Sequence, residues 1–595
     1  MRHKIKLAMG RIAGGCHMNR DANLSLIYIA SVAALLFMVA LARTGHQDAW
    51  VLQDILVPTV AYILVFAIIV VRVDSNRNIA ALSASFLLVL CTIPNLKYDL
   101  FSGNFDSVGH YGFVSRLLLS GHVPQTGFYS IPYGDFPGMQ IVIGEVSLVM
   151  GIPVNGAIKL FTTVMLGIIP LMVYFVSNGI FDREVQRAIL LASGLPCIAA
   201  PYLLGGGAFG VALLFCFLCV LLRRGYSTHN RLGYLSLLVL LGFAVLFSHP
   251  PTMIYLLVIL GVMLLFLPLY GRATKRPVGD YGKNIWGIFL ILSISFVAVQ
   301  VLRAQFILEI LAELVREIFL RESTRPAIPT TFFSLPLSAK FRVLAVMHTN
   351  DIQLAGLALL GFLIIFKRTR FRSSGIFDRF YLPLTCVLVL LVSIVVIQLV
   401  SGFGRFGYDR AVTYAMVFEA FLVGPLLWYL GGLRKPRMRP VLLSLLLFGI
   451  ISLSLVQVFV YQPMIPPASE LSKALPQDEY LFDFRQVNSI YNIRAIAFAE
   501  SRSSSRARVT SDIVTRWQIY GFTSESFSSR HIYDSPLETT SSLEWDLFIL
   551  HYAGEAGILN EKVEYRTRER IAMIKDTEGN TVYDNGASFI ISGLP

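Results

Sequence analysis

Long apolar blocks separated by short polar loops make up most of the chain. The blocks lack the period-two alternation of a membrane-spanning strand, and each is long enough to cross a hydrocarbon core as a helix. The pattern therefore predicts an α-helical polytopic membrane protein of about thirteen transmembrane helices. The predicted spans are 24–43, 53–71, 79–94, 157–180, 188–203, 206–222, 233–249, 251–270, 285–302, 352–366, 380–400, 411–430 and 440–461.

One more apolar segment, 138–150, is short and carries Gln140 and Glu145. Segments of this kind are typically interfacial or re-entrant. If it does not cross and the N-terminus is cytoplasmic, three strongly basic loops all fall in the cytoplasm, as the positive-inside rule requires. We therefore expect the N-terminus inside and the C-terminus outside. The three basic loops are 272–283, 367–372 and 434–439.

This topology places four segments on the outer face. Within one of them, Phe306 to Phe319, apolar pairs recur every four residues between charged positions, which predicts an amphipathic helix lying on the membrane surface. The four segments are the loops 95–156 and 303–351, the corner 248–251 and the glycine-rich loop 401–410.

The composition turns polar after the last span. Residues 506–511 and 543–551 are typical of strands, and 581–591 predict a hairpin closed by Asn585-Gly586, because this pair adopts the positive φ angles of a tight turn. We therefore expect a small extracytoplasmic α/β domain. The predicted division is a cytoplasmic segment 1–23, a membrane domain 24–462 and a soluble domain 463–595.

Composition agrees with a membrane protein: 55% of the 595 residues are hydrophobic and only 15% are charged. The net charge of +13 lies largely in short loops rather than on a basic face with aromatics, so no nucleic-acid partner is expected. Five of the six cysteines lie in apolar blocks. Cys216 and Cys219 have the spacing of a metal or redox motif, but their unbroken apolar surroundings favour core-facing or lipid-facing residues.

The first outer loop concentrates side chains that could carry chemistry. It holds Asp99, Asp106, His110, Tyr111 and Arg116 within a short stretch beside the membrane. A spacing of four puts Asp106 and His110 on one face of a helix. A carboxylate there can deprotonate a hydroxyl or hold a metal, and a His or Arg can bind a phosphate. The alternative is that these are ordinary solvated loop residues.

The loop reads Asp-x-x-x-His at 106–110, then an Arg, then Gly-x-x-Pro at 121–124 and a Tyr/Pro/Gly stretch. This order resembles the GT-C glycosyltransferases, which include oligosaccharyltransferase catalytic subunits, protein mannosyltransferases and aminoarabinose transferases. The resemblance implies a multi-span bundle, a catalytic Asp in the first outer loop and a polyprenyl-linked sugar donor. It assigns that Asp to Asp106, with Asp99 as the second candidate, and His110 matches archaeal-type oligosaccharyltransferases.

The resemblance leaves the cofactor open, with a divalent metal (Mg or Mn) as the candidate, and it implies a prokaryotic, archaeal-leaning cell membrane. Two departures separate the chain from oligosaccharyltransferases. The loop with their second acidic pair is Gly205-Gly206-Gly207 here, and Glu544-Trp545-Asp546 is a poor substitute for their Trp-Trp-Asp-Tyr-Gly signature. Transfer of a single sugar is therefore favoured over en bloc transfer of an oligosaccharide.

Two further outer features suit a lipid phosphate. His249 ends a span where Pro250 and Pro251 break the helix; it either binds substrate or simply stays hydrated. Arg405 and Arg410 lie in the glycine-rich loop, and guanidinium groups bind phosphate oxygens in pairs. The alternative for the two arginines is interfacial anchoring.

Together these features predict a membrane glycosyltransferase. The donor is a polyprenyl-linked sugar, and the acceptor is a glycan, a lipid or a protein. Asp106, Asp99 and His110 are the candidate catalytic residues. The candidate substrate-binding residues are Arg116, His249, Arg405, Arg410 and Tyr111. A flippase-like or other non-catalytic protein for lipid-linked glycans is the alternative, but the spans are almost free of charge and give it no polar path.

Overall fold

The computed structural model describes most of the membrane domain and short segments of the tail. The described residues are 22–39, 52–97, 105–123, 136–195, 206–224, 231–274, 281–304, 353–367, 376–401, 408–432, 438–461, 500–501, 509–511, 531–534, 547–551, 579–584 and 588–593. The expected amphipathic helix 306–319 lies outside them.

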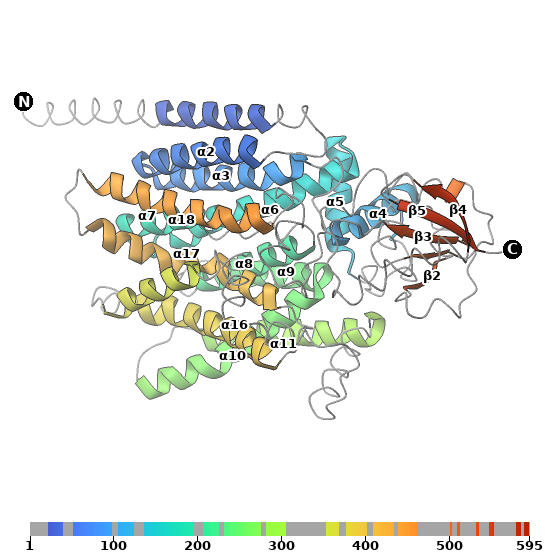
Figure 1. Cartoon of the computed structure of the whole chain (residues 1–595). Coiled ribbons are helices and arrows are strands. Elements are labelled where there is room, and N and C mark those ends of the chain that lie inside the picture. The colour runs from blue at the N-terminus through green and yellow to red at the C-terminus, as the bar shows by residue number, and fades with distance from the viewer. Residues whose placement is uncertain are drawn as a thin grey trace, which may run out of the picture.

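Most of the described chain is a bundle of apolar helices (Figure 1). The helix α3 packs along α6, α17 packs on α7 and α16, α18 packs on α2, and α8 packs on α6 and α9. Besides Ala22–Val39 and Gln353–Lys367, the longer helices are α2 (Leu52–Arg72), α3 (Asn76–Lys97), α6 (Val154–Ser177), α8 (Gly206–Arg224), α9 (Arg231–Ser248), α10 (Pro250–Thr274), α11 (Tyr281–Val299), α16 (Leu382–Ser401), α17 (Tyr408–Gly432) and α18 (Arg439–Tyr461). The shorter ones are α4 (Phe105–Ser120), α5 (Gly138–Met150), α7 (Arg183–Ala192) and the π-helical turns η2 (Gln300–Ala304) and η3 (Phe377–Tyr381).

Five of the described helices are long and apolar enough to cross a membrane, and eight shorter apolar helices accompany them. The five are Ala22–Val39, Val154–Ser177, Pro250–Arg272, Ile285–Leu302 and Tyr414–Gly432. The expected span 188–203 is described only in part: α7 begins earlier, at Arg183, because the Asp182 carboxylate caps it by accepting a hydrogen bond from the Val185 N–H (3.2 Å). The number of spans and their orientation therefore stay predictions.

One continuous apolar core runs through the bundle, and pairs of aromatic rings lie within it. Phe66 of α2 and Phe86 of α3 stack with ring centroids 3.8 Å apart. Phe380 of η3 meets Phe421 of α17 edge to face at 5.1 Å. Such ring pairs add to the burial of apolar area that fixes neighbouring helices.

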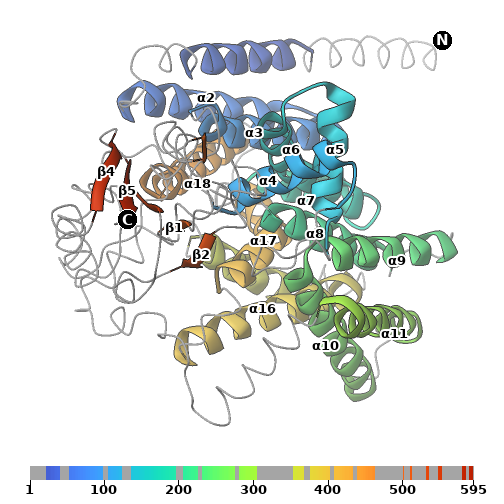
Figure 2. The same ribbon diagram turned by 90° about the vertical axis from the view of Figure 1, so that its right-hand side faces the viewer.

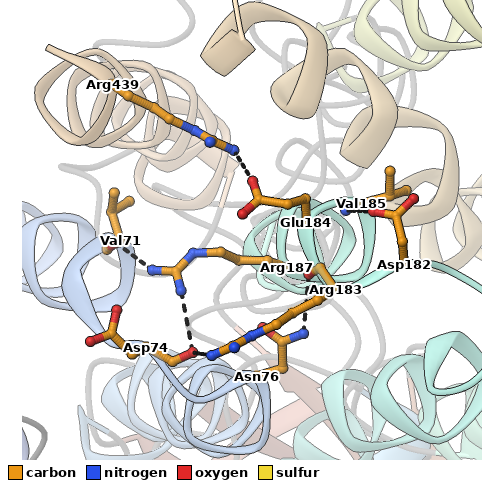
Figure 3. A network of polar contacts seen from close by, with 9 residues as sticks. All are labelled: Val71, Asp74, Asn76, Asp182, Arg183, Glu184, Val185, Arg187 and Arg439. Atoms are coloured by element: carbon orange, nitrogen blue, oxygen red, sulfur yellow. Dashed lines mark hydrogen bonds and ion pairs between the residues drawn. The ribbon is translucent and has the colours of Figure 1, made fainter. Parts of the chain in front are cut away.

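A polar network closes one end of the bundle (Figure 3). Arg187 of α7 donates to the carbonyls of Val71 (2.6 Å) and Asp74 (3.4 Å), and Arg183 donates to the Asp74 carbonyl (3.2 Å). These bonds tie the short turn between α2 and α3 to α7. Burial lowers the pKa of Arg187, an effect that the neighbouring carboxylates of Asp74 and Glu184 oppose. We call this end of the bundle the basic end.

The opposite end of the bundle carries α4 and α5. Figures 1 and 2 both draw α5 upright, across the direction of the bundle helices. Its 13 residues span about 20 Å, short of a hydrocarbon core of about 30 Å. Both helices end on a glycine in the left-handed region, Gly121 after α4 (φ +70°) and Gly151 after α5 (φ +64°). Glycine is the residue that adopts this conformation without strain, which explains why each helix stops there.

Five strands lie in the tail and form one sheet of order β2-β1-β3-β5-β4, drawn in Figure 1 beyond the end with α4 and α5. The pairs β1–β2 and β1–β3 are parallel, whereas β3–β5 and β4–β5 are antiparallel. The predicted Asn585-Gly586 turn lies outside the described residues, as do Glu544-Trp545-Asp546. The strands are β1 (Val509–Ser511), β2 (His531–Asp534), β3 (Leu547–His551), β4 (Gly579–Asp584) and β5 (Ser588–Gly593).

Candidate functional site

The first candidate residue that the structure places is His110, on α4. Its ring is 1% exposed, and its Nδ1 lies 3.0 Å from the Nε2 of Gln140, which is itself fully buried on α5. An amide nitrogen can only donate, so Nδ1 accepts and the ring proton sits on Nε2 in this arrangement. His110 is therefore a buried residue that joins two helices. It is not a solvated loop residue.

The packing of α4 on α5 explains this burial. Val114 and Leu118 of α4 lie against Gly144 of α5, where a Cβ would be within 3.5 to 3.8 Å of their methyl groups. A small apolar cluster separate from the main core continues from there to α6 and α8. We call it the rim cluster; it consists of Val114, Met139, Ile143, Ala157, Ile158, Phe161 and Phe209.

The other candidates of the first outer loop are placed less fully. Asp106 lies on α4 one turn before His110, so the two share a helix face as the spacing predicts. The Asp106 side chain and all of Asp99 lie outside the described part. Tyr111 is half-buried against the rim cluster. Arg116 is six residues beyond His110, about 120° around the helix, so the structure does not bring these two side chains to one face.

The second candidate, His249, is the single residue between α9 and α10. The helix α9 ends with the bond from the His249 N–H to the Val245 carbonyl (2.9 Å), and α10 begins with the bond from the Met253 N–H to the His249 carbonyl (3.3 Å). Pro250 and Pro251 have no N–H, so the carbonyls of the last turn of α9 lose their helical donors. The sequence thus makes a sharp corner with His249 at its apex.

His249 is buried at this corner, being 6% exposed, and is not a hydrated helix end. Its Nδ1 lies 2.6 Å from the Oγ1 of Thr252, and that oxygen lies 2.6 Å from the hydroxyl of Tyr414 on α17. Thr252 is fully buried and Tyr414 is 1% exposed. The ring of Tyr255 meets the Tyr414 ring edge-on with centroids 4.9 Å apart. Three polar side chains from two helices and the corner thus form one buried chain.

Two glycines let neighbouring helices approach this corner closely. A Cβ on Gly138, at the start of α5, would lie 2.5 Å from the Oγ of Ser248 and 3.0 Å from the Phe247 carbonyl oxygen. A Cβ on Gly210 of α8 would collide with the Oγ1 of Thr252 and lie 2.8 Å from the Nδ1 of His249. The N-terminus of α5 therefore abuts the C-terminal end of α9, a favourable meeting of opposite helix-dipole ends.

The third candidate region is the start of α17. Arg410 lies in the first turn of this helix, and Tyr414 follows one turn later on the same face. Through Tyr414, the start of α17 is fixed beside the His249 corner. The Arg410 side chain and the whole of Arg405 lie outside the described residues.

The helix α5 connects these regions. Gln140 holds His110, and Gly138, two residues earlier, lies against Ser248 beside His249. We call this end of the bundle, with the starts of α5, α8, α10 and α17, the site end.

Sequence reasoning missed three members of this arrangement. Gln140 had a signal, being a polar residue in an apolar helix, but Thr252 and Tyr414 are ordinary residues of apolar spans. Outside this arrangement, Glu419 is a further residue with a clear signal, because it is an acidic residue inside the predicted span 411–430. It is 7% exposed. Leu422 lies three residues on, and a Cβ on Gly361 would collide with its carbonyl, so this face of α17 packs on Gln353–Lys367.

Within the described residues, no group of three or more His, Cys, Asp or Glu side chains could hold a metal ion. The requirement for Mg or Mn stays a prediction. Cys219 is buried in the core and Cys216 is half-buried in α8, and neither forms a disulfide, in agreement with their interpretation as core-facing or lipid-facing residues.

Comparisons with known proteins give similarity in structure alone. No protein-family model and no curated protein match the chain. ArnT from Cupriavidus metallidurans bound to undecaprenyl phosphate is similar over 86% of this chain and 97% of its own, with 10% identity and a TM-score of 0.47. The apo state of the same protein covers 82% and 93%, with 11% identity and a TM-score of 0.43. The Archaeoglobus fulgidus oligosaccharyltransferase in complex with Zn and sulfate covers 80% and 68%, with 11% identity and a TM-score of 0.46.

Proposed function

We propose that the chain is an integral-membrane glycosyltransferase of the GT-C type. It moves a sugar from a polyprenyl-phosphate donor to an acceptor at the outer face of a prokaryotic membrane. The observation that carries the proposal is the convergence at the site end: α5 contacts the helix of Asp106 and His110 and also the His249 corner, which holds the start of α17 with Arg410.

The distribution of basic residues supports an outer location for this site. The helices α8 and α10 have one end at the site end, and their opposite ends carry Arg223 and Arg272. Arg72, Lys367 and Arg439 lie at helix ends that are cytoplasmic in the predicted topology. Basic residues concentrate on the cytoplasmic side of membrane proteins. The site end is then extracytoplasmic, on the side where the C-terminal tail follows α18.

The proposed reaction is a single displacement at the anomeric carbon of the sugar. The Asp106 carboxylate takes the proton of an acceptor hydroxyl as that oxygen bonds to the anomeric carbon, with Asp99 as the second candidate base. The bond from the anomeric carbon to the phosphate oxygen breaks, and its electron pair goes to the phosphate. Arg405 and Arg410 hold this leaving group, whose negative charge grows in the transition state.

The burial of His110 gives it a supporting role in this scheme. Through its bond to Gln140 it fixes α4, and with it Asp106, against α5. His249 and Tyr111 complete the proposed substrate-binding set, while Arg116 faces away from His110 and would contact substrate from another side. A single sugar is the proposed cargo, and a glycan, lipid or protein is the acceptor.

The experiment that tests the function is a transfer assay. Purified protein in nanodiscs is given a polyprenyl-phosphate donor with a radiolabelled sugar and a membrane-fraction acceptor, with and without Mg²⁺, Mn²⁺ or chelator. Appearance of label in a product other than the donor, dependent on the protein, is expected. A protein that binds the donor but never moves its label, with every acceptor fraction, contradicts the proposal.

Glu419 favours one alternative, a flippase-like protein for lipid-linked glycans. Buried acidic residues within membrane spans commonly line substrate or ion paths, and Glu419 is buried in α17. If the chain is a flippase, Glu419→Gln slows translocation of a fluorescent lipid-linked glycan in liposomes by about tenfold or more. If the chain is a transferase, wild-type protein translocates no faster than empty liposomes.

A further inference from the structure

Exposed arginines gather at the basic end, around the turn between α2 and α3. Arg72 is the last residue of α2 and Arg77 is the second residue of α3, and both are exposed. Among the described residues, neither of them forms a hydrogen bond or an ion pair. We propose that this surface binds an anionic phospholipid of the adjacent leaflet, with its phosphate among the arginines and its acyl chain along α18. This lipid site lies at the opposite end of the bundle from the site end and does not depend on the proposed function.

Hydrogen bonds bring a third arginine to the same turn (Figure 3). Arg183, the first residue of α7, is exposed and donates to the carbonyl of Asp74, in the middle of the turn (3.2 Å). The Arg183 carbonyl in turn accepts from the Nδ2 of Asn76, the residue before Arg77 (3.3 Å). The backbone segments that carry Arg72, Arg77 and Arg183 are therefore fixed against one another.

A fourth arginine is brought alongside by the packing of α18 on α2. Ser444 of α18 donates to the carbonyl of Ala67 in α2 (3.2 Å). The two helices run in opposite directions, because α2 ends and α18 begins at the basic end. Arg72 and Arg439 each lie five residues from this contact, so they are at the same level on neighbouring helices, about 7.5 Å beyond it. We call Arg72, Arg77, Arg183 and Arg439 the arginine surface.

The positive charge of this surface is only partly neutralised within the described residues. Arg183 and Arg187 donate to carbonyls, which are uncharged acceptors. Arg439 pairs with Glu184 (2.7 Å), but its side chain stays 32% exposed. Around the turn, the guanidinium groups of Arg72, Arg77, Arg183, Arg187 and Arg439 face the carboxylates of Asp74, Asp182 and Glu184. The excess positive charge attracts an anion, and the planar guanidinium groups suit the oxygens of a phosphate.

An exposed apolar strip beside the arginines favours a lipid over a soluble anion. Met438, just before α18, and Val441 and Leu445 of α18 lie on one helix face and are 56%, 48% and 60% exposed. The strip begins next to Arg439 and continues toward the middle of the helix, as an acyl chain continues from its phosphate into the membrane. One phospholipid can therefore contact the arginines and the strip together.

Such a lipid would stabilise the folded protein. Its phosphate would bridge the α2–α3 turn, the start of α7 and the start of α18, which are distant along the chain. A ligand that binds only the folded state raises the temperature of unfolding as its concentration increases.

The first test compares two lipids that differ in charge. Thermal unfolding of the full-length protein in a non-ionic detergent is followed with added dioctanoyl phosphatidylglycerol or dioctanoyl phosphatidylcholine. We expect phosphatidylglycerol to raise the Tm in a saturable way and phosphatidylcholine to have little effect. Equal shifts for the two lipids contradict the proposal. An equal shift with inorganic phosphate shows a site for a soluble anion and contradicts it as well.

The second test removes the two exposed arginines. One basic residue near an anionic lipid surface contributes about fivefold in affinity, so Arg72→Gln/Arg77→Gln should raise the Kd for phosphatidylglycerol by about tenfold or more. Arg72→Lys/Arg77→Lys keeps the charge and should retain most of the binding. Without lipid, both double variants should unfold at the wild-type temperature, since neither side chain is bonded within the described residues. Wild-type affinity in the glutamine variant contradicts the proposal.

A matched control removes the same charge elsewhere at the basic end. Arg272 of α10 and Lys367 are both exposed, and Figures 1 and 2 both draw α10 on the side of the bundle away from α2. Arg272→Gln/Lys367→Gln should leave the Kd unchanged. If it weakens binding as much as Arg72→Gln/Arg77→Gln, the lipid responds to the overall charge and the arginine surface is not its site.

The third test locates the acyl chain in the wild type and needs no substitution. Phosphatidylglycerol with a photoactivatable diazirine in its acyl chain is cross-linked to the protein, and the modified peptides are identified by mass spectrometry. We expect labelling around Val441 and Leu445 that excess unlabelled phosphatidylglycerol suppresses. Labelling confined to other helices contradicts the placement on α18. Sugar transfer is measured separately, so a failed lipid site leaves the proposed function standing, and an inactive protein can still bind the lipid.

Discussion

At the scale of single residues, His110 and His249 become buried for different reasons. His110 lies on a regular helix and is covered by α5, whereas His249 occupies the one-residue link between two helices and is covered by Gly210 of α8. Both rings have Nδ1 engaged by a neutral polar partner. Both rings are thus tied to a neighbouring helix through Nδ1, and we give neither of them the role of general base.

The acid one turn before His110 is the residue on which the proposed chemistry depends most. Asp106→Asn keeps size and hydrogen-bonding capacity but removes the proton-accepting carboxylate, so we expect sugar transfer to fall about 100-fold or more. The amount of folded protein should stay normal. The measurement is the initial rate of label transfer at saturating donor.

Asp99→Asn is the matched comparison for this prediction. If Asp106→Asn transfers near the wild-type rate and Asp99→Asn does not, the role of base moves to Asp99. If both variants keep the wild-type rate, neither carboxylate is the base.

Arginine and lysine at positions 405 and 410 distinguish phosphate binding from membrane anchoring. Lysine keeps the positive charge and the interfacial preference but lacks the planar pair of donors. If the arginines bind a phosphate, Lys should cost about 1–2 kcal/mol, which is roughly a tenfold loss or more in donor kcat/KM, and Ala should cost more. Equal donor kcat/KM for Arg, Lys and Ala at both positions would leave only the anchoring interpretation.

At the scale of elements, the sequence predicted what depends on local pattern. The apolar segment 138–150 coincides with α5, and the corner at Pro250 and Pro251 lies where the prolines indicated. The start of α7 at Arg183 was not predicted, because the capping by Asp182 competes with an apolar pattern that begins later. The sequence also could not show that Gly138 and Gly210 contact the His249 corner. Gly138 is more than a hundred residues from the corner along the chain and Gly210 is about forty, and a local pattern does not predict contacts between such distant segments.

The glycine at the start of α5 gives a prediction about how the elements fit. In Gly138→Ala the new Cβ meets the Ser248 Oγ at 2.5 Å and the Phe247 carbonyl oxygen at 3.0 Å. Since backbone has to move, we expect a loss of about 1–3 kcal/mol of stability and weaker donor binding. Thermal unfolding in matched detergent measures the first effect, and the donor Kd measures the second.

Two other glycines serve as controls for this substitution. Gly287 of α11 and Gly449 of α18 have nothing within 4 Å of a built Cβ, and alanine is the better helix former. Gly287→Ala and Gly449→Ala should therefore be neutral or slightly stabilising. A Gly138→Ala protein that unfolds at the same temperature as these two would contradict the close packing of α5 on the corner.

At the scale of the whole molecule, the two ends of the bundle differ in chemistry. The basic end is held by arginines that donate to backbone carbonyls and by the Arg439–Glu184 ion pair (2.7 Å). The site end has histidines, hydroxyls and an amide buried between close-packed helices. The loop charges predicted this asymmetry from the sequence. The grouping of His110, His249 and α17 did not follow from it, because each lies in a different predicted outer segment.

The asymmetry of the two ends predicts the orientation of the chain in the membrane. Single cysteines near Arg276, Lys367 and Lys435 should be shielded from an impermeant thiol reagent in intact cells, because the basic loops are expected in the cytoplasm. A cysteine near Asn585 in the tail should react without permeabilisation, as should one at Gly121, directly after α4 at the site end. All positions should react after permeabilisation, which controls for burial.

Reaction at Lys367 in intact cells would reverse the orientation. Protection at Gly121 together with reaction at Asn585 would place the site end and the tail on different sides of the membrane. Either result would remove the outer-leaflet donor from the proposed mechanism, because the phosphate-binding residues would then face the cytoplasm.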